Sequence, residues 1–178
     1  TLNAGIAGGA DIILIPEIPY DIDKVCESVL KRSESGKNFS IVAVAEGVFD
    51  QNEAQLKKKE RARLRAEAGI TAQRRITTAT NRIAAQIQSK TGLETRTCVP
   101  GHMLRGGSPS AYDRILATQF GVHAAKLISQ EKYGRTVAKI GGKITANKLE
   151  DIAGKTKFVD PSDQLVKTAK NLGISFGD

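Results

Sequence analysis

Short apolar runs and helically spaced apolar positions alternate along the first part of the chain. Residues 11–15 and 40–45 are runs of β-branched and small side chains, a pattern typical of strands buried in a parallel sheet. Between them, Asp21 is expected to cap a helix that ends at Ser35 and Gly36. A strand, a helix and a strand in this order predict a parallel βαβ unit with a right-handed crossover.

Further elements are predicted on both sides of this unit, beginning with a helix that ends at Gly8 and Gly9. Apolar spacing predicts inward-facing residues on the two longest helices: Ile83 and Ile87, and Ile115, Leu116, Phe120, Leu127 and Ile128. The expected elements are helices at 77–90, 111–130, 148–153 and 162–172, and strands at 95–99 and 136–140. The fold class predicted for residues 1–178 is α/β: a Rossmann-like open, mostly parallel sheet flanked by helices.

Residues 48–75 interrupt this alternation and read as an exposed insertion with some helix. The net charge of +8 suggests nucleic-acid binding, but many of the basic residues lie in 57–65 and 74–75. The chain has no Trp, three Tyr and five Phe, so stacking platforms for bases are scarce. A solvated basic face is the preferred interpretation, with no nucleic-acid partner; a nucleic-acid-binding module is kept as an alternative, which a steep salt dependence of binding would support.

The remaining composition indicates the compartment. No apolar run approaches the length needed to span a bilayer, and the first residues lack the pattern of a secretory signal. The only cysteines, Cys26 and Cys98, lie in apolar patterns without metal-ligand spacing. They are expected to be buried free thiols, and the expected location is the cytoplasm, with no membrane partner. Because residue 1 falls within a predicted helix, the chain is expected to be part of a longer one.

The glycine-rich run Gly-His-Met-Leu-Arg-Gly-Gly-Ser-Pro, residues 101–109, carries the main candidate chemistry. Ser108 is expected to cap the following helix, with Pro109 as its first residue. The helix N-terminus would then direct free backbone N–H groups and a positive dipole end at a ligand. A plain loop-to-helix junction without a ligand is the alternative.

Side chains near this turn favour an anion. His102 and Arg105 flank it, and Gly106 and Gly107 allow a ligand to approach the backbone closely, so a phosphate site is predicted. Glu46 directly follows the strand at 40–45, and the carboxyl ends of parallel strands meet at one edge of a sheet. A carboxylate facing a basic cradle suits a sugar phosphate; the alternative for Glu46 is a capping or surface carboxylate.

These residues resemble a known family. The run 101–109, followed by Tyr112-Asp113-Arg114, is similar to a long signature of the 6-phosphofructokinases. The segments 7–17, 42–47 and 94–96 match the same family in the same order, so the resemblance covers nearly the whole chain apart from the insertion and the tail. It places the chain in the carboxyl-terminal half of such an enzyme, which implies the corresponding portion of the phosphofructokinase fold.

The resemblance implies a glycolytic enzyme that transfers a phosphoryl group to the 1-hydroxyl of fructose 6-phosphate. Glu46 would bind the sugar, and His102 and Arg105 would bind its phosphate, with Gly106 and Gly107 as backbone donors. Arg96 would reach the phosphate in a neighbouring subunit, which implies a homo-oligomer with shared sites. Residues 112–114 are interpreted as structural.

Other parts of the family's pattern are missing from this chain. The donor loops and the catalytic Asp lie in the amino-terminal half, so this chain is expected to hold no catalytic residue and to be inactive alone. The donor would be ATP or pyrophosphate, with Mg²⁺ bound through that absent half. Gly9, Asp11 and Lys37 fit the family's effector site, whereas Ser35 and Phe39 depart from it. A non-catalytic sugar-phosphate-binding regulatory subunit of the same fold is the alternative.

Overall fold

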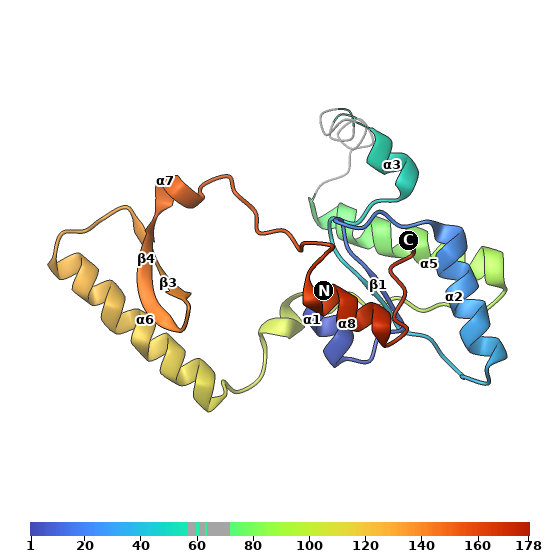
Figure 1. The fold of residues 1–178 in the computed structure, drawn as a ribbon, viewed down its shortest axis with the longest axis horizontal. Helices are drawn as coiled ribbons and strands as arrows, with labels where there is room; N and C mark the ends of the chain where they lie inside the picture. The colour runs from blue at the N-terminus through green and yellow to red at the C-terminus, as the bar shows by residue number, and fades with distance from the viewer. Residues whose placement is uncertain (57–59, 61–62, 64–71) are drawn as a thin grey trace. The chain divides into compact units, whose positions relative to one another are not determined.

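The computed structural model describes residues 1–56, 60, 63 and 72–178 (Figure 1). The chain forms two compact units. Unit 1 comprises Thr1–Val99 and Phe158–Asp178, and unit 2 comprises Pro100–Lys157. Unit 2 is thus an excursion of the chain between two parts of unit 1.

The predicted βαβ unit is confirmed in unit 1. Strands β1 and β2 pair in parallel, with Ile12 opposite Val42, and α2 connects them. On the other edge of β1, Ile12 forms a parallel bridge with Ser175, which returns from the far end of the chain. The elements of unit 1 are α1 (Leu2–Ala7), β1 (Ile12–Leu14), α2 (Ile22–Glu34), β2 (Val42–Val44), α3 (Gln51–Gln55), α5 (Ala72–Thr91) and α8 (Gln164–Asn171).

The ends of α1 and α2 lie where the sequence predicts them. The Asp21 carboxylate accepts a hydrogen bond from the Asp23 N–H at 2.8 Å and so caps the first turn of α2. The helix ends at Ser35, and Gly36 follows with φ +82°, a left-handed conformation that glycine adopts at low cost. Helix α1 likewise ends at Gly8.

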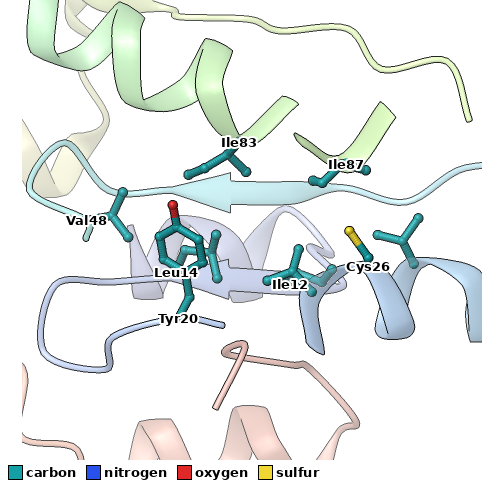
Figure 2. Packing of buried hydrophobic residues seen from close by; sticks show 9 residues of the cluster. Ile12, Leu14, Tyr20, Cys26, Val48, Ile83 and Ile87 are labelled. Atoms are coloured by element: carbon teal, nitrogen blue, oxygen red, sulfur yellow. The ribbon is translucent and has the colours of Figure 1, made fainter. Parts of the chain in front are cut away.

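The core of unit 1 lies on both faces of β1. Ile12 and Leu14 face a cluster to which α2 and α5 contribute, including the predicted inward residues Ile83 and Ile87 (Figure 2). Ile13 and its neighbours on the other face belong to a second cluster, covered by α1 and α8. Because side chains alternate along a strand, a continuous apolar run such as 11–15 can supply both faces.

The strand expected at 95–99 is wrong. This segment joins no backbone ladder. It bonds side chains of α5 instead: the Thr97 hydroxyl donates to Asn81 at 3.3 Å, and the Thr95 N–H donates to the side chain of Gln88 at 3.3 Å. Since the segment pairs with no strand, the expected burial of Cys98 is also wrong; this thiol is exposed and free.

Cys26 is a free, buried thiol, as expected. Burial raises the pKa of Cys26, which disfavours the thiolate that reacts with alkylating reagents. We expect Cys26 to react at least about tenfold more slowly in the native protein than in denaturant. Peptide mapping after timed alkylation, with Cys26→Ala as the control, measures this directly; equal rates in both conditions would contradict the burial.

Unit 2 contains a hairpin that the sequence analysis missed in part. Strand β4 pairs antiparallel with β3, the strand expected at 136–140. Gly141 and Gly142 connect them, both with positive φ, as a tight two-residue turn requires. The elements of unit 2 are η1, a 3₁₀ helix (Gly101–Arg105), α6 (Ala111–Ser129), β3 (Arg135–Ile140), β4 (Lys143–Lys148) and α7 (Leu149–Ile152).

Helix α6 forms as expected, but its apolar residues are not buried. Leu116, Phe120 and Leu127 are only half-buried, and Ile115 and Ile128 are 61% and 62% exposed, so the inward orientation expected for these two is wrong. None of residues 100–157, all of which the structure describes, is fully buried. A single helix against a two-stranded hairpin offers too little cover for a closed core.

The beginning of the expected insertion at 48–75 belongs to the fold of unit 1. Val48 is 3% exposed and packs in the cluster with Leu14 and Ile83. Helix α3 follows, and α5 already begins at residue 72. Apart from residues 60 and 63, the stretch 57–71 lies outside the described residues, so its exposure and the role of its basic residues stay predictions.

Candidate functional site

Glu46 lies in the turn that follows β2, at the strand's carboxyl end as expected. The backbone on both sides of it is fixed: the Ala45 N–H donates to the Leu14 carbonyl at 2.9 Å, and the Val48 N–H closes the turn onto the Ala45 carbonyl at 3.2 Å. Glu46 itself is exposed. An exposed carboxylate on an anchored turn is suited to accept hydrogen bonds from a ligand's hydroxyl groups.

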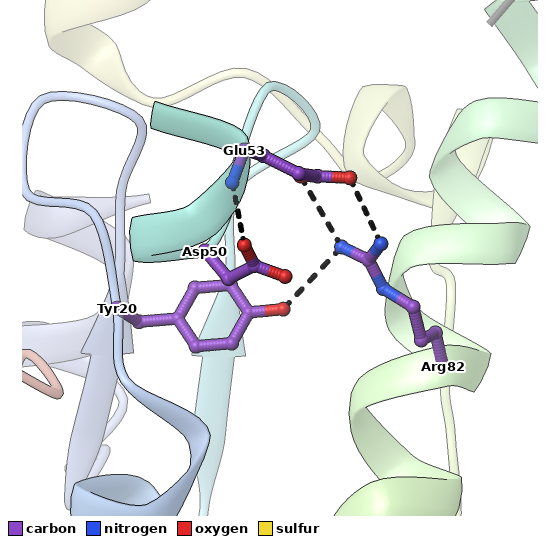
Figure 3. Close-up of polar contacts among 4 residues, drawn as sticks. All are labelled: Tyr20, Asp50, Glu53 and Arg82. Atoms are coloured by element: carbon purple, nitrogen blue, oxygen red, sulfur yellow. Dashed lines mark hydrogen bonds and ion pairs between the residues drawn. The ribbon is translucent and has the colours of Figure 1, made fainter. Parts of the chain in front are cut away.

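A polar cluster of Tyr20, Glu53 and Arg82, which the sequence analysis missed, is shown in Figure 3. It is tied to the segment that follows this turn, since the Tyr20 N–H donates to the Phe49 carbonyl at 3.4 Å. The Arg82 guanidinium donates to both carboxylate oxygens of Glu53, at 2.9 and 3.4 Å, and to the Tyr20 hydroxyl at 3.4 Å. The bond to Glu53 is the main cause that raises the pKa of Arg82, and burial raises the pKa of Tyr20. The residues are far apart in sequence and follow no motif, so only the tertiary structure brings them together.

Arg96, the expected contact to a neighbouring subunit, is exposed and pairs with Glu94. Its guanidinium donates to a Glu94 carboxylate oxygen at 2.9 Å. Both side chains line a groove of about 400 Å³ between the end of α2 and the segment after α5. The other lining residues are Val29, Ser33, Lys37, Asn38, Phe39, Ser40, Val42, Ile87, Leu93 and Thr95.

Asp11, which the family resemblance assigns to an effector site, is engaged inside unit 1. Its carboxylate pairs with Arg32 at 2.9 Å and accepts the Ile41 N–H at 2.8 Å. Arg32 also donates to the Phe39 carbonyl at 3.1 Å. These bonds join β1, α2 and the segment leading into β2, which is a sufficient structural reason for an aspartate at position 11.

His102 and Arg105 both lie on η1 in unit 2 and are exposed. Residues three apart on a 3₁₀ helix eclipse one another, so the two side chains share one face. The Gly106 N–H donates to the Met103 carbonyl at 3.1 Å, so this expected phosphate donor is engaged within the turn. Gly107 follows with φ +90°.

The helix N-terminus expected at Ser108 is wrong. Helix α6 begins after Ser110, whose hydroxyl accepts the Asp113 N–H while the Asp113 carboxylate accepts the Ser110 N–H at 2.9 Å. The Ser110 N–H and the Ser110 hydroxyl both donate to the Asp113 carboxylate, and these two bonds lower the pKa of Asp113. A reciprocal capping box outcompetes the Ser-Pro start because it satisfies two backbone donors. Asp113 is therefore structural, as expected, and the dipole end of α6 lies beyond the two glycines.

The residues expected to form the site are divided between the units. Glu46 and Arg96 belong to unit 1, and His102 and Arg105 belong to unit 2. Each pair is accessible within its own unit, since all four residues are exposed.

Two further properties hold for the part of the chain that the structure describes. No helix there is long and apolar enough to cross a bilayer. No group of three or more His, Cys, Asp or Glu residues gathers as metal ligands would.

Comparison with known proteins decides the family. The family model described as phosphofructokinase matches residues 1–128. The chain belongs to the phosphofructokinase family. Its alignment to the carboxyl-terminal half of curated relatives confirms the resemblance found in the signature around His102 and Arg105.

Curated relatives are similar over almost the whole chain. An ATP-dependent 6-phosphofructokinase of Spirochaeta thermophila is 46% identical over 177 residues, which are 99% of this chain and 47% of the relative. ATP-dependent 6-phosphofructokinase 2 of Clostridium perfringens is 44% identical over 187 residues, again 99% of this chain and 47% of the relative. The chain therefore spans about half the length of the curated relatives that it matches.

Solved structures confirm the α/β phosphofructokinase fold. Phosphofructokinase of Saccharomyces cerevisiae matches with a TM-score of 0.61 and 27% identity, covering 99% of this chain and 21% of that one. Pichia pastoris phosphofructokinase in the T-state matches with a TM-score of 0.58 and 31% identity, covering 84% of this chain and 15% of that one.

Proposed function

We propose that the protein containing this chain is a 6-phosphofructokinase, which transfers a phosphoryl group to the 1-hydroxyl of fructose 6-phosphate. The observation that carries the proposal is the exposed His102 and Arg105 pair on one face of η1, inside the signature that the family model matches. The relatives that match the whole chain are named 6-phosphofructokinases, which supports the same reaction.

The proposed contribution of this chain is one side of the sugar-phosphate site. Arg105 and His102 neutralise the sugar's phosphate, and Glu46 accepts hydrogen bonds from its hydroxyl groups and orients it. Positioning of the reactants and neutralisation of their charge account for most of the rate enhancement in enzymatic phosphoryl transfer. The family resemblance places the donor-binding residues in the amino-terminal half, so we expect the 178-residue chain alone to give no turnover.

Arg96 is proposed to serve the site of a neighbouring subunit in a homo-oligomer. Its present partner, Glu94, is exposed, and exposed ion pairs contribute only about 0–1 kcal/mol. Releasing Glu94 therefore costs little, and a phosphate offers Arg96 a doubly charged group that can accept two parallel N–H bonds in exchange.

The phosphoryl donor is proposed to be ATP, with pyrophosphate as the alternative. The relatives at 46% and 44% identity are named ATP-dependent. Mg²⁺ is proposed to accompany the donor and to be held by the donor-binding half that the family resemblance implies. We further propose a cytoplasmic location for this reaction.

Product formation by the full-length protein tests the reaction and the donor. The protein is incubated with fructose 6-phosphate and Mg²⁺, and ATP or pyrophosphate is added in separate reactions. Fructose 1,6-bisphosphate formed with ATP is the expected result, and its formation only with pyrophosphate would reverse the choice of donor. If neither donor gave product while fructose 6-phosphate still bound, the protein would instead be a non-catalytic sugar-phosphate-binding subunit.

A further inference from the structure

We propose that Arg82 is a positioning residue for the Glu46 carboxylate, through its bonds to Tyr20 and Glu53. This inference rests on the proposed function, because it takes Glu46 as a contact to the sugar phosphate. Arg82 lies on α5, and its guanidinium bonds Tyr20 and Glu53 rather than the turn that carries Glu46. It acts through the backbone that follows this turn.

Glu46 depends on the backbone for its position. Among the described residues, none forms a hydrogen bond or ion pair with the Glu46 carboxylate, and the side chain is exposed. The turn is held before it by the Ala45–Leu14 bond and after it by the burial of Val48. Displacement of the backbone after the turn would therefore move the carboxylate directly.

The backbone after Val48 is tied to Tyr20. The Tyr20 N–H donates to the Phe49 carbonyl at 3.4 Å, and the Gln51 N–H donates to the Tyr20 carbonyl at 3.0 Å. Asp50, between them, caps α3 by accepting the Glu53 N–H at 2.8 Å. Residues 49–51 therefore keep their place only as long as Tyr20 and α3 keep theirs.

Arg82 holds both of these anchors at once. Its guanidinium bonds the Tyr20 hydroxyl and, with two N–H groups, the carboxylate of Glu53 on α3 (Figure 3). The Tyr20 ring is completely buried, and the Arg82 and Glu53 side chains are 37% and 28% exposed. A partly buried bidentate pair is more rigid than an exposed single bond, because its planar fork restricts both partners.

The test compares fructose 6-phosphate kinetics of variants of the full-length protein. We expect Arg82→Leu to raise the KM for fructose 6-phosphate by about fivefold, with the KM of the phosphoryl donor unchanged. Arg82→Lys, which keeps the charge and can still bond Glu53, should recover part of this loss. Tyr20→Phe removes only the hydroxyl group and should give a smaller change in the same direction.

Lys90→Leu is the matched control. Lys90 also lies on α5 and pairs with a carboxylate of another helix, Asp23, at 2.6 Å, but neither side chain forms a hydrogen bond or ion pair with the described residues 45–51. A comparable change in the KM for fructose 6-phosphate on loss of Lys90 would show that removing any ion pair from α5 has this effect, and the proposal would be wrong.

A double-mutant cycle with Glu46→Gln separates this inference from the proposed function. Glu46→Gln should raise the KM for fructose 6-phosphate by about tenfold. Adding Arg82→Leu should then change the KM little, because there is no carboxylate left to position. If the two substitutions changed the KM independently, the role of Arg82 would be overturned, while the role of Glu46 would stand. An unchanged KM in Glu46→Gln itself would overturn the role of Glu46 in the proposed function.

Discussion

Replacing Arg105 with alanine is expected to weaken fructose 6-phosphate binding by about 10- to 150-fold. Loss of a hydrogen bond to a charged group costs roughly 1.5–3 kcal/mol, and each 1.4 kcal/mol is a factor of ten. Arg105 is exposed at the end of η1, so its removal leaves no buried group without a partner. Equilibrium binding to the full-length protein, by calorimetry in the absence of the donor, measures the effect.

Arg135→Ala is the control for this measurement. Arg135 is an exposed arginine of the same unit, at the start of β3 and outside the glycine-rich turn. Its loss removes the same charge but should leave the affinity for fructose 6-phosphate within about twofold. Equal losses in both variants would indicate a general electrostatic attraction rather than a phosphate site at Arg105.

The substitution Gly177→Ala is expected to destabilise unit 1 by about 2–5 kcal/mol. Gly177 has φ +73°, where a Cβ costs roughly 1–2 kcal/mol. That Cβ would also lie 2.9 Å from Val25 Cγ2 and 3.0 Å from Tyr20 Cβ. Such overpacking adds about 1–3 kcal/mol.

Gly173→Ala separates the two causes. Gly173 has a similar φ of +83°, but nothing lies within 4 Å of its added Cβ, so it carries only the backbone cost. The midpoints of urea unfolding, followed for both variants of the full-length protein, should show the larger decrease for Gly177→Ala. Equal decreases would mean that Tyr20 and Val25 do not pack against this glycine as described.

The elements whose causes are local could be predicted from the sequence. The helix after Asp21 has its capping side chain, its apolar face and its terminating glycine within one segment. The two short apolar runs on either side of this helix predict the two parallel strands. The paired glycines 141 and 142, between two short segments, are also a local signal for a hairpin.

Elements that depend on distant partners could not be predicted. Residues 95–99 have strand-like composition, yet a strand needs a neighbour's free backbone edge, and here the Thr95 N–H and the Thr97 hydroxyl bond side chains of α5 instead. Ile115 and Ile128 follow a helical pattern, but the pattern does not show which part of the chain, if any, packs against these side chains. The start of α6 was misplaced by two residues because Ser108 and Ser110 are both acceptable caps, and only Ser110 has Asp113 three residues later.

The candidate site shows the same division. The position of Glu46 followed from the end of one apolar run, and the shared face of His102 and Arg105 lies within one turn of chain. Arg82, in contrast, is 62 residues from Tyr20 and 29 from Glu53, and neither separation belongs to a motif. Its role could not be predicted from the sequence, because it depends on the packing of α5 against the segment that follows β2.

The bridge between Ile12 and Ser175 has a consequence for synthesis on the ribosome. One of the two apolar clusters on β1 draws Val166, Ala169 and Phe176 from the last part of the chain. While the nascent chain lacks these residues, only α1 can cover Ile13 and its neighbours on that face. Unit 1 is therefore expected to complete its fold only after residues 100–157 have been translated, although its two strands and the helix between them are made first.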